Sequence, residues 1–133
     1  MLLDPAWQHG QGLADPIRGF VLASGVYDLE PVRLSARNTY LHLTESDVLA
    51  LSPHRHLPAM PPPTTLFWGD GELTEFKRQS EAFAAALNAA GGAVTTHVIA
   101  GSNHFDVYDL FGDPKSAVVD AVRRQAAGLP LGE

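Results

Sequence analysis

A short apolar run that ends in two glycines and two acids stands at the centre of this chain: Thr64-Thr65-Leu66-Phe67-Trp68-Gly69-Asp70-Gly71-Glu72. A run of this length and composition is typical of a buried parallel strand. A second run, residues 94–99, is followed by Ala100-Gly101-Ser102-Asn103-His104, so it also ends in glycine and then a titratable side chain. Because functional residues of open α/β sheets lie just beyond the carboxyl ends of the strands, these two loops predict a site at one sheet edge.

Composition limits the classes of protein that the chain can belong to. With 133 residues, of which 45% are hydrophobic and 18% charged, residues 1–133 are expected to form one globular domain. A net charge of −6 without a basic cluster argues against a nucleic-acid partner. The absence of cysteine excludes disulfides, thiolate metal sites and a cysteine nucleophile. No apolar run approaches the ~20 residues that cross a bilayer, and the N-terminus lacks a signal-peptide pattern, so we expect a soluble cytoplasmic protein with no membrane partner.

Strands and helices are expected to alternate along the chain. Three strand candidates of similar length occur, at residues 17–23, 64–68 and 94–99. A helix is predicted at residues 74–90, with Thr74 as its N-cap and Gly91-Gly92 as its end. A last helix is predicted at residues 114–127, with Asp113-Pro114 as its cap and first-turn proline. This order implies a parallel sheet with right-handed crossovers.

The segment between the first two strands is less regular. Pro31 predicts an extended residue before it, and residues 54–63 form a proline-rich connector. One short helix that ends near Leu51 is expected here, with Thr44 or Ser46 as its cap. We interpret the whole segment as a lid or a surface excursion.

Four segments carry a family resemblance: residues 24–32 (SGVYDLEPV), 51–53 (LSP), 72–80 (ELTEFKRQS) and 101–107 (GSNHFDV). Together they resemble the C-terminal half of an α/β-hydrolase, most of all the kynurenine formamidase (arylformamidase) branch and its esterase relatives. The resemblance implies a partial α/β-hydrolase fold, with three parallel strands and flanking helices but without the N-terminal half of the sheet. It also implies a serine-type hydrolase, without a cofactor, that acts on a small carboxylic ester or an N-formyl aryl amide.

The resemblance also implies site residues. His104 matches the histidine of a Ser–His–acid triad, and Glu72 matches the acid at the fourth position of Gly69-Asp70-Gly71-Glu72. Asp70 lies nearer the strand end and is the alternative acid. An acid or a histidine alone after a strand is more often structural than catalytic, but the two after successive strands favour a triad ancestry.

A nucleophile is missing from the pattern. No G-x-S-x-G elbow occurs in the chain. Ser24 follows a strand, but Leu22 and Val26 stand where the elbow glycines would be, so we interpret it as a turn residue. Ser102 is too close in sequence to His104 for its hydroxyl to meet the imidazole well.

These observations leave the function open between three hypotheses. By resemblance, residues 1–4 fall in the helix after the elbow, so we interpret the chain as a fragment that is inactive alone. One alternative is a non-catalytic binding or interaction module derived from the same fold. The other is an unrelated flavodoxin-like domain, but the sequence has no Gly-rich phosphate-binding loop to support it. His54-x-His56 lies in the proline-rich connector without a third ligand nearby, so no metal is expected. An unpaired edge at residues 17–23 predicts self-association.

Overall fold

The computed structural model describes residue 10 and residues 17–129. The expectation that residues 1–4 belong to the helix after the elbow therefore lies outside the described residues. Three strands, β1 (Phe20–Ala23), β2 (Thr64–Gly69) and β3 (Val94–Ile99), form a parallel sheet in the order β1-β2-β3. The three predicted strands and their parallel pairing are confirmed, although β1 is shorter than residues 17–23.

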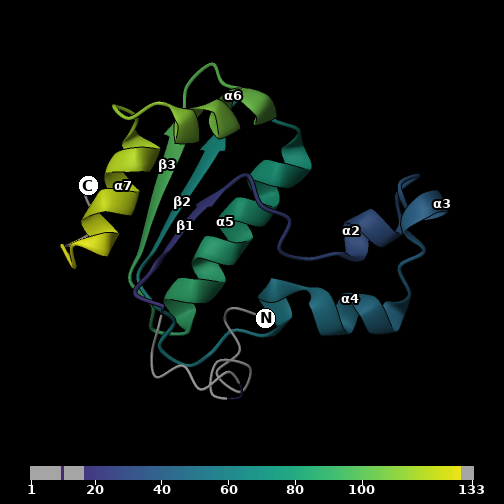
Figure 1. Cartoon of the computed structure of the whole chain (residues 1–133). Coiled ribbons are helices and arrows are strands. Elements are labelled where there is room, and N and C mark those ends of the chain that lie inside the picture. The colour runs from purple at the N-terminus through teal and green to yellow at the C-terminus, as the bar shows by residue number, and fades with distance from the viewer. Residues whose placement is uncertain (1–9, 11–16, 130–133) are drawn as a thin grey trace.

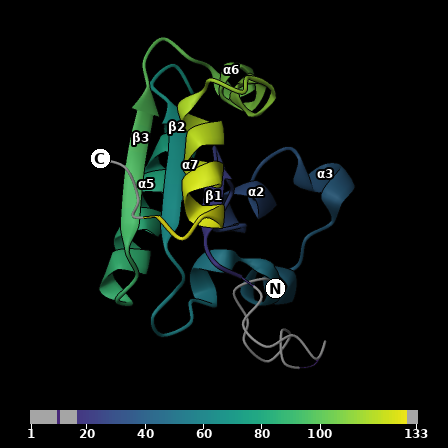
Figure 2. The same ribbon diagram turned by 60° about the vertical axis from the view of Figure 1, so that its left-hand side comes forward.

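Two helices cover opposite faces of this sheet, α5 (Thr74–Ala89) on one and α7 (Ala117–Ala126) on the other (Figure 1, Figure 2). Side chains of β2 alternate between the two faces, because successive residues of a strand point in opposite directions. Leu66 and Trp68 belong to a core with Tyr27, Phe83, Ala84 and Leu87. Phe67 belongs to a second core with Val107 and Val118. The continuous apolar run of β2 is therefore buried on both faces, as its composition predicts.

Both long helices begin differently from the prediction. Thr74 is the first residue of α5 rather than its cap; Leu73 holds the cap position and makes no side-chain hydrogen bond there. α7 begins at Ala117, and its cap is Ser116, whose hydroxyl accepts a hydrogen bond from the Val119 N–H. Asp113 instead caps a turn, because its carboxylate accepts from the Lys115 N–H at 2.9 Å. The predicted start at Asp113-Pro114 is therefore wrong by one turn.

The segment between β1 and β2 folds into short helices on the β1 side of the sheet (Figure 2). These helices are α2 (Glu30–Arg33), α3 (Asn38–Leu41), α4 (Glu45–Leu51) and the 3₁₀ turn η1 (Pro53–Arg55). Thr44 caps α4 in a capping box with Asp47. The residue before Pro31 is helical rather than extended, because Pro31 lies in the first turn of α2, where a proline is tolerated.

One helix was not expected from the sequence: α6 (His104–Asp109), which lies over the ends of the strands and continues into the 3₁₀ turn η2 (Leu110–Gly112) (Figure 1). Asn103 caps α6 and forms a capping box with Asp106. His104 is therefore the first residue of a capped helix, which fixes its backbone. Within the described residues, none of the helices combines the length and the apolar character that a bilayer crossing requires.

Candidate active site

Three loops meet where the parallel strands end. Ser24 follows β1, Glu72 comes three residues after Gly69 at the end of β2, and His104 begins α6 after β3. Parallel strands in one sheet bring their carboxyl ends to one edge, so side chains from distant parts of the chain converge there.

Glu72 is the centre of this convergence. It is 6% exposed, and its carboxylate has partners on both oxygens. Oε1 accepts hydrogen bonds from the hydroxyl of Ser24 and from the backbone N–H of Gly69 at 3.0 Å. Oε2 lies 3.2 Å from Nδ1 of His104. A carboxylate can only accept, so Nδ1 carries the proton of this contact and the lone pair of the neutral ring lies on Nε2.

The aromatic surroundings of His104 restrict its ring. Phe76 of α5 packs against it with ring centroids 4.4 Å apart. Tyr108 and Phe105 of α6 meet it edge-on at 5.0 Å and 5.9 Å. The side chain is still 30% exposed. The imidazole is thus held by a carboxylate on one nitrogen and by three aromatic rings, while part of it remains open to solvent.

Asp70 has a different position. It is exposed, and its carboxylate accepts a hydrogen bond from the backbone N–H of Gly101 at 2.7 Å. Its carbonyl oxygen accepts from Nζ of Lys77 at 3.0 Å. The structure therefore brings Glu72, and not Asp70, to the imidazole; Asp70 ties the loop after β2 to the loop after β3.

A close backbone approach joins the same two loops. The N–H of Gly71 donates to the carbonyl of Ser102 at 3.1 Å. A Cβ on Gly69 would lie 2.0 Å from that same carbonyl oxygen. Only glycine fits at this point, and its absent side chain lets the loop that carries His104 lie against the end of β2.

The two serines considered from the sequence have structural contacts. Ser24 is buried and has a positive φ of 49°. Its hydroxyl donates to Glu72 rather than to the imidazole, so it is not oriented to pass a proton to His104. Ser102 contributes its backbone carbonyl group, which accepts the hydrogen bond from the N–H of Gly71. The sequence reasoning missed the contact between Ser24 and Glu72, although both residues follow paired strands.

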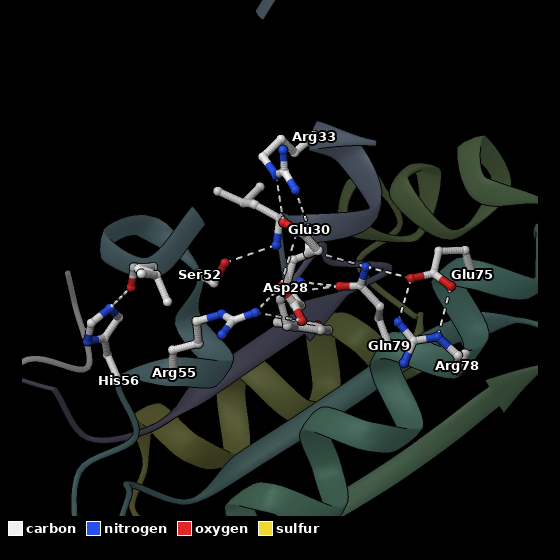
Figure 3. Close-up of polar contacts among 12 residues, drawn as sticks. Asp28, Glu30, Arg33, Ser52, Arg55, His56, Glu75, Arg78 and Gln79 are labelled. Atoms are coloured by element: carbon white, nitrogen blue, oxygen red, sulfur yellow. Dashed lines mark hydrogen bonds and ion pairs between the residues drawn. The ribbon is translucent and has the colours of Figure 1, made fainter. Parts of the chain in front are cut away.

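A second polar network connects α5 with the loop that follows β1, and it uses Glu75 and Gln79 of the ELTEFKRQS segment. Gln79 of α5 is buried, and its Oε1 accepts from the backbone N–H groups of Tyr27 and Asp28 at 2.7 Å and 2.8 Å. Its Nε2 donates to the carbonyl of Asp28 at 3.0 Å and to Glu75 at 2.9 Å (Figure 3). One side chain on a helix thereby satisfies three backbone groups of the loop that follows β1.

Asp28 connects this network to the excursion, that is, to the short helices between β1 and β2. Arg55 pairs with its carboxylate at 3.3 Å, and the N–H of Glu30 donates to it at 3.1 Å (Figure 3). Partial burial acts to raise the pKa of Asp28, but these two donors outweigh it and hold the pKa below its ordinary value. The N–H of Leu29 donates to Ser52 at 3.0 Å. The loop that follows β1 is therefore held by hydrogen bonds from both α5 and the excursion.

A cavity of about 240 Å³ lies beside Phe76. Its wall is mainly apolar and includes Val26, Pro31, Val32 and Leu73, and it carries two side chains of opposite charge, Arg37 and Glu75. Because Phe76 contacts both the cavity and the ring of His104, the cavity adjoins the site.

The two histidines of the proline-rich connector make different contacts: the ring of His54 lies 6.2 Å from that of Phe83. Nε2 of His56 lies 2.7 Å from the carbonyl of Leu49. In the part of the chain that the structure describes, no three His, Asp or Glu side chains gather as a metal site would require.

Comparison with known proteins gives relatives of a consistent kind. No protein-family model matches the chain. A kynurenine formamidase of Danio rerio is 30% identical over 118 residues, which cover 85% of this chain and 40% of that protein. The solved structure of a candidate thioesterase from a Silicibacter species has a TM-score of 0.78 at 22% identity, over 92% of this chain and 44% of that one. The apo form of esterase 2 from Thermogutta terrifontis has a TM-score of 0.63 at 20% identity, over 92% and 47%.

The chain thus spans about two fifths of the length of the curated relatives that it matches. The structural matches identify the fold, and the sequence matches extend over most of this chain. The chain has a partial α/β-hydrolase fold and resembles the kynurenine formamidase and esterase branch of that superfamily.

Proposed function

We propose that this chain supplies the histidine and the acid of a serine hydrolase that cleaves a small carboxylic ester or an N-formyl aryl amide. The observation that carries the proposal is the contact between Glu72 and Nδ1 of His104 at the carboxyl ends of adjacent parallel strands. Such a contact leaves Nε2 as the base, which is the arrangement of a Ser–His–acid triad.

In this proposal the nucleophilic serine comes from outside the described residues. Nε2 of His104 takes the proton of the serine hydroxyl as its oxygen attacks the carbonyl carbon. The same proton then passes to the leaving amine or alcohol, and water releases the acyl group by the reverse transfers. Glu72 keeps the ring in the required tautomer and stabilises the imidazolium that forms in between.

The cavity beside Phe76 supports a substrate with an apolar part. Its apolar wall suits an aryl or acyl group, and Phe76 connects this wall to the imidazole of His104. The similarity to proteins named kynurenine formamidase favours the formamide among the possible substrates.

The first test is to read the genomic sequence upstream of Met1 for an in-frame Gly-x-Ser-x-Gly segment, and to produce the longer protein. Hydrolysis of an N-formyl aryl amine and of an aryl ester is then measured. We expect His104→Ala to lower kcat on the order of 10⁴- to 10⁶-fold, and Glu72→Ala by a somewhat smaller factor. The 133-residue chain alone is expected to be inactive.

Asp70→Asn is the matched control, because it changes an acid on the same turn that does not touch the imidazole. Loss of activity in Asp70→Asn but not in Glu72→Ala would assign the acid to Asp70. If neither variant nor His104→Ala changes the rate, the site is not catalytic and the chain is a binding module of the same fold.

A further inference from the structure

Ser24 occupies a position that a serine does not ordinarily favour. It follows β1 directly, is 2% exposed, and has a φ of 49° in the left-handed region. Its backbone N–H donates to the carbonyl of Phe67 at 2.9 Å, which continues the pairing of β1 with β2. Glycine would adopt this conformation with less strain. The side chain is therefore present at a backbone cost, which points to a task for the hydroxyl.

The task is visible in the contacts of Glu72. The hydroxyl of Ser24 and the N–H of Gly69 both donate to Oε1, so this oxygen has two donors from two different strand ends. With Oε1 held in this way, Oε2 is the oxygen that faces Nδ1 of His104. If the hydroxyl were removed, the N–H of Gly69 would be the remaining donor to Oε1, and a single donor on this oxygen would hold the carboxylate less firmly against the contact with His104.

We propose that Ser24 is a positioning residue, which holds Glu72 in the rotamer that sets the orientation and tautomer of His104. A role of Ser24 in catalysis rests on the proposed function, whereas its effect on the orientation of the imidazole is independent of that function. Ser24 does not touch the reacting atoms in this scheme; it acts only through Glu72.

The test is a measurement of the ¹⁵N chemical shifts of both ring nitrogens of His104 in the 133-residue chain. These shifts report which nitrogen carries the proton. Two variants remove the hydroxyl with opposite effects on the backbone: Ser24→Ala keeps the strain of the positive φ, and Ser24→Gly relieves it. Ser80→Ala is the matched control, because Ser80 is equally buried and its hydroxyl has no hydrogen-bond partner among the described residues.

We expect the native chain and Ser80→Ala to show the proton mainly on Nδ1. Both Ser24 variants should shift toward the tautomer mixture of a free imidazole. Glu72→Gln should move the proton to Nε2, since its amide group presents a donor to Nδ1. Native-like shifts in both Ser24 variants would overturn the inference, and so would a change in Ser24→Ala that Ser24→Gly does not share, because the backbone would then be the cause.

The longer protein separates this inference from the proposed function. If it hydrolyses the substrates, Ser24→Gly should lower kcat by up to about 100-fold with little change in KM, while Ser80→Ala leaves both unchanged. A protein without hydrolytic activity would end the proposed function, yet the ¹⁵N shifts would still decide whether Ser24 orients the ring. An active protein whose kcat is unchanged in Ser24→Gly would overturn the positioning role itself.

Discussion

Gly69 shows how a single missing side chain positions the site. A Cβ at this position would meet the backbone carbonyl of Ser102, and backbone cannot move aside as a flexible side chain can. We expect Gly69→Ala to force the end of β2 away from the loop that carries His104, at a cost of roughly 3 kcal/mol of unfolding free energy. Urea unfolding followed by tryptophan fluorescence measures this, since Trp68 is the neighbouring residue.

Gly101→Ala is the control for that prediction. Gly101 has a φ of +69°, but a Cβ there would meet nothing within 4 Å. Only the strain of the left-handed conformation is expected, about 1 kcal/mol. An equal loss in the two variants would show that close approach is not what requires glycine at residue 69.

The lowered pKa of Asp28 predicts how the free energy of unfolding depends on pH. Because its pKa is lowered in the folded state, the stability that it contributes is fully present above its unfolded pKa, about 4, and is lost as the pH falls through the lower folded value. The difference in unfolding free energy between the native chain and Asp28→Asn should therefore be largest near neutral pH and should shrink below about pH 4. Urea titrations at a series of pH values measure it, and a difference that grows on acidification would contradict the assignment.

At the scale of elements, Gln79 joins α5 to the loop after β1. Gln79→Ala would leave the N–H groups of Tyr27 and Asp28 without their acceptor, and an unsatisfied buried donor costs about 1–3 kcal/mol. We expect a loss of roughly 2–4 kcal/mol, measured by urea unfolding. Arg78→Ala, the adjacent residue, removes an exposed ion pair with Glu75 and should cost less than about 1 kcal/mol.

The short helices of the excursion illustrate why some elements escape prediction. α2 and α3 have four residues each, too few to display a helical period in the sequence. Their positions depend on contacts such as the pair between Arg55 and Asp28, which joins residues 27 positions apart. α6 is similar, because its six residues begin inside residues 101–107, a motif recognised for its histidine rather than for its cap.

At the scale of the whole molecule, β1 pairs with β2 on one side, and no described strand pairs with its other side. Large apolar side chains are also exposed, among them Leu34, Tyr40 and Met60. An unpaired strand edge and exposed apolar surface both favour association with another chain. We predict that the 133-residue chain self-associates through β1. Analytical ultracentrifugation should then show a sedimentation coefficient that rises with protein concentration.

Val98→Lys tests which edge is used. Val98 lies on β3, the opposite edge, and is 55% exposed. Association through β1 should persist in this variant. If the variant becomes monomeric, β3 is the interface. A monodisperse native chain that unfolds cooperatively with ordinary stability would contradict both the association and the interpretation of the chain as a fragment.

The sequence by itself determined the strands, their parallel order and the identity of the two loops that carry the site. The apolar run at residues 64–68 predicts a buried strand, because burial on both faces requires continuous hydrophobicity. The same expectation for residues 94–99 is wrong: β3 is an edge strand of the described sheet, and none of its residues is fully buried. The resemblance of residues 72–80 and 101–107 pointed to Glu72 and His104 by local patterns alone. These are properties of neighbouring residues, so they can be read along the chain.

Only the tertiary structure decided which acid meets the imidazole, what Ser24 does and why Gly69 is a glycine. Asp70 and Glu72 are two residues apart and chemically alike, and their roles differ because one side chain turns into the sheet edge while the other reaches Gly101. The contacts of Ser24 with Glu72 and of Gly69 with Ser102 join residues 48 and 33 positions apart. Such pairs leave no local pattern, because the distance between two side chains is set by strand register and loop packing rather than by either residue's neighbours.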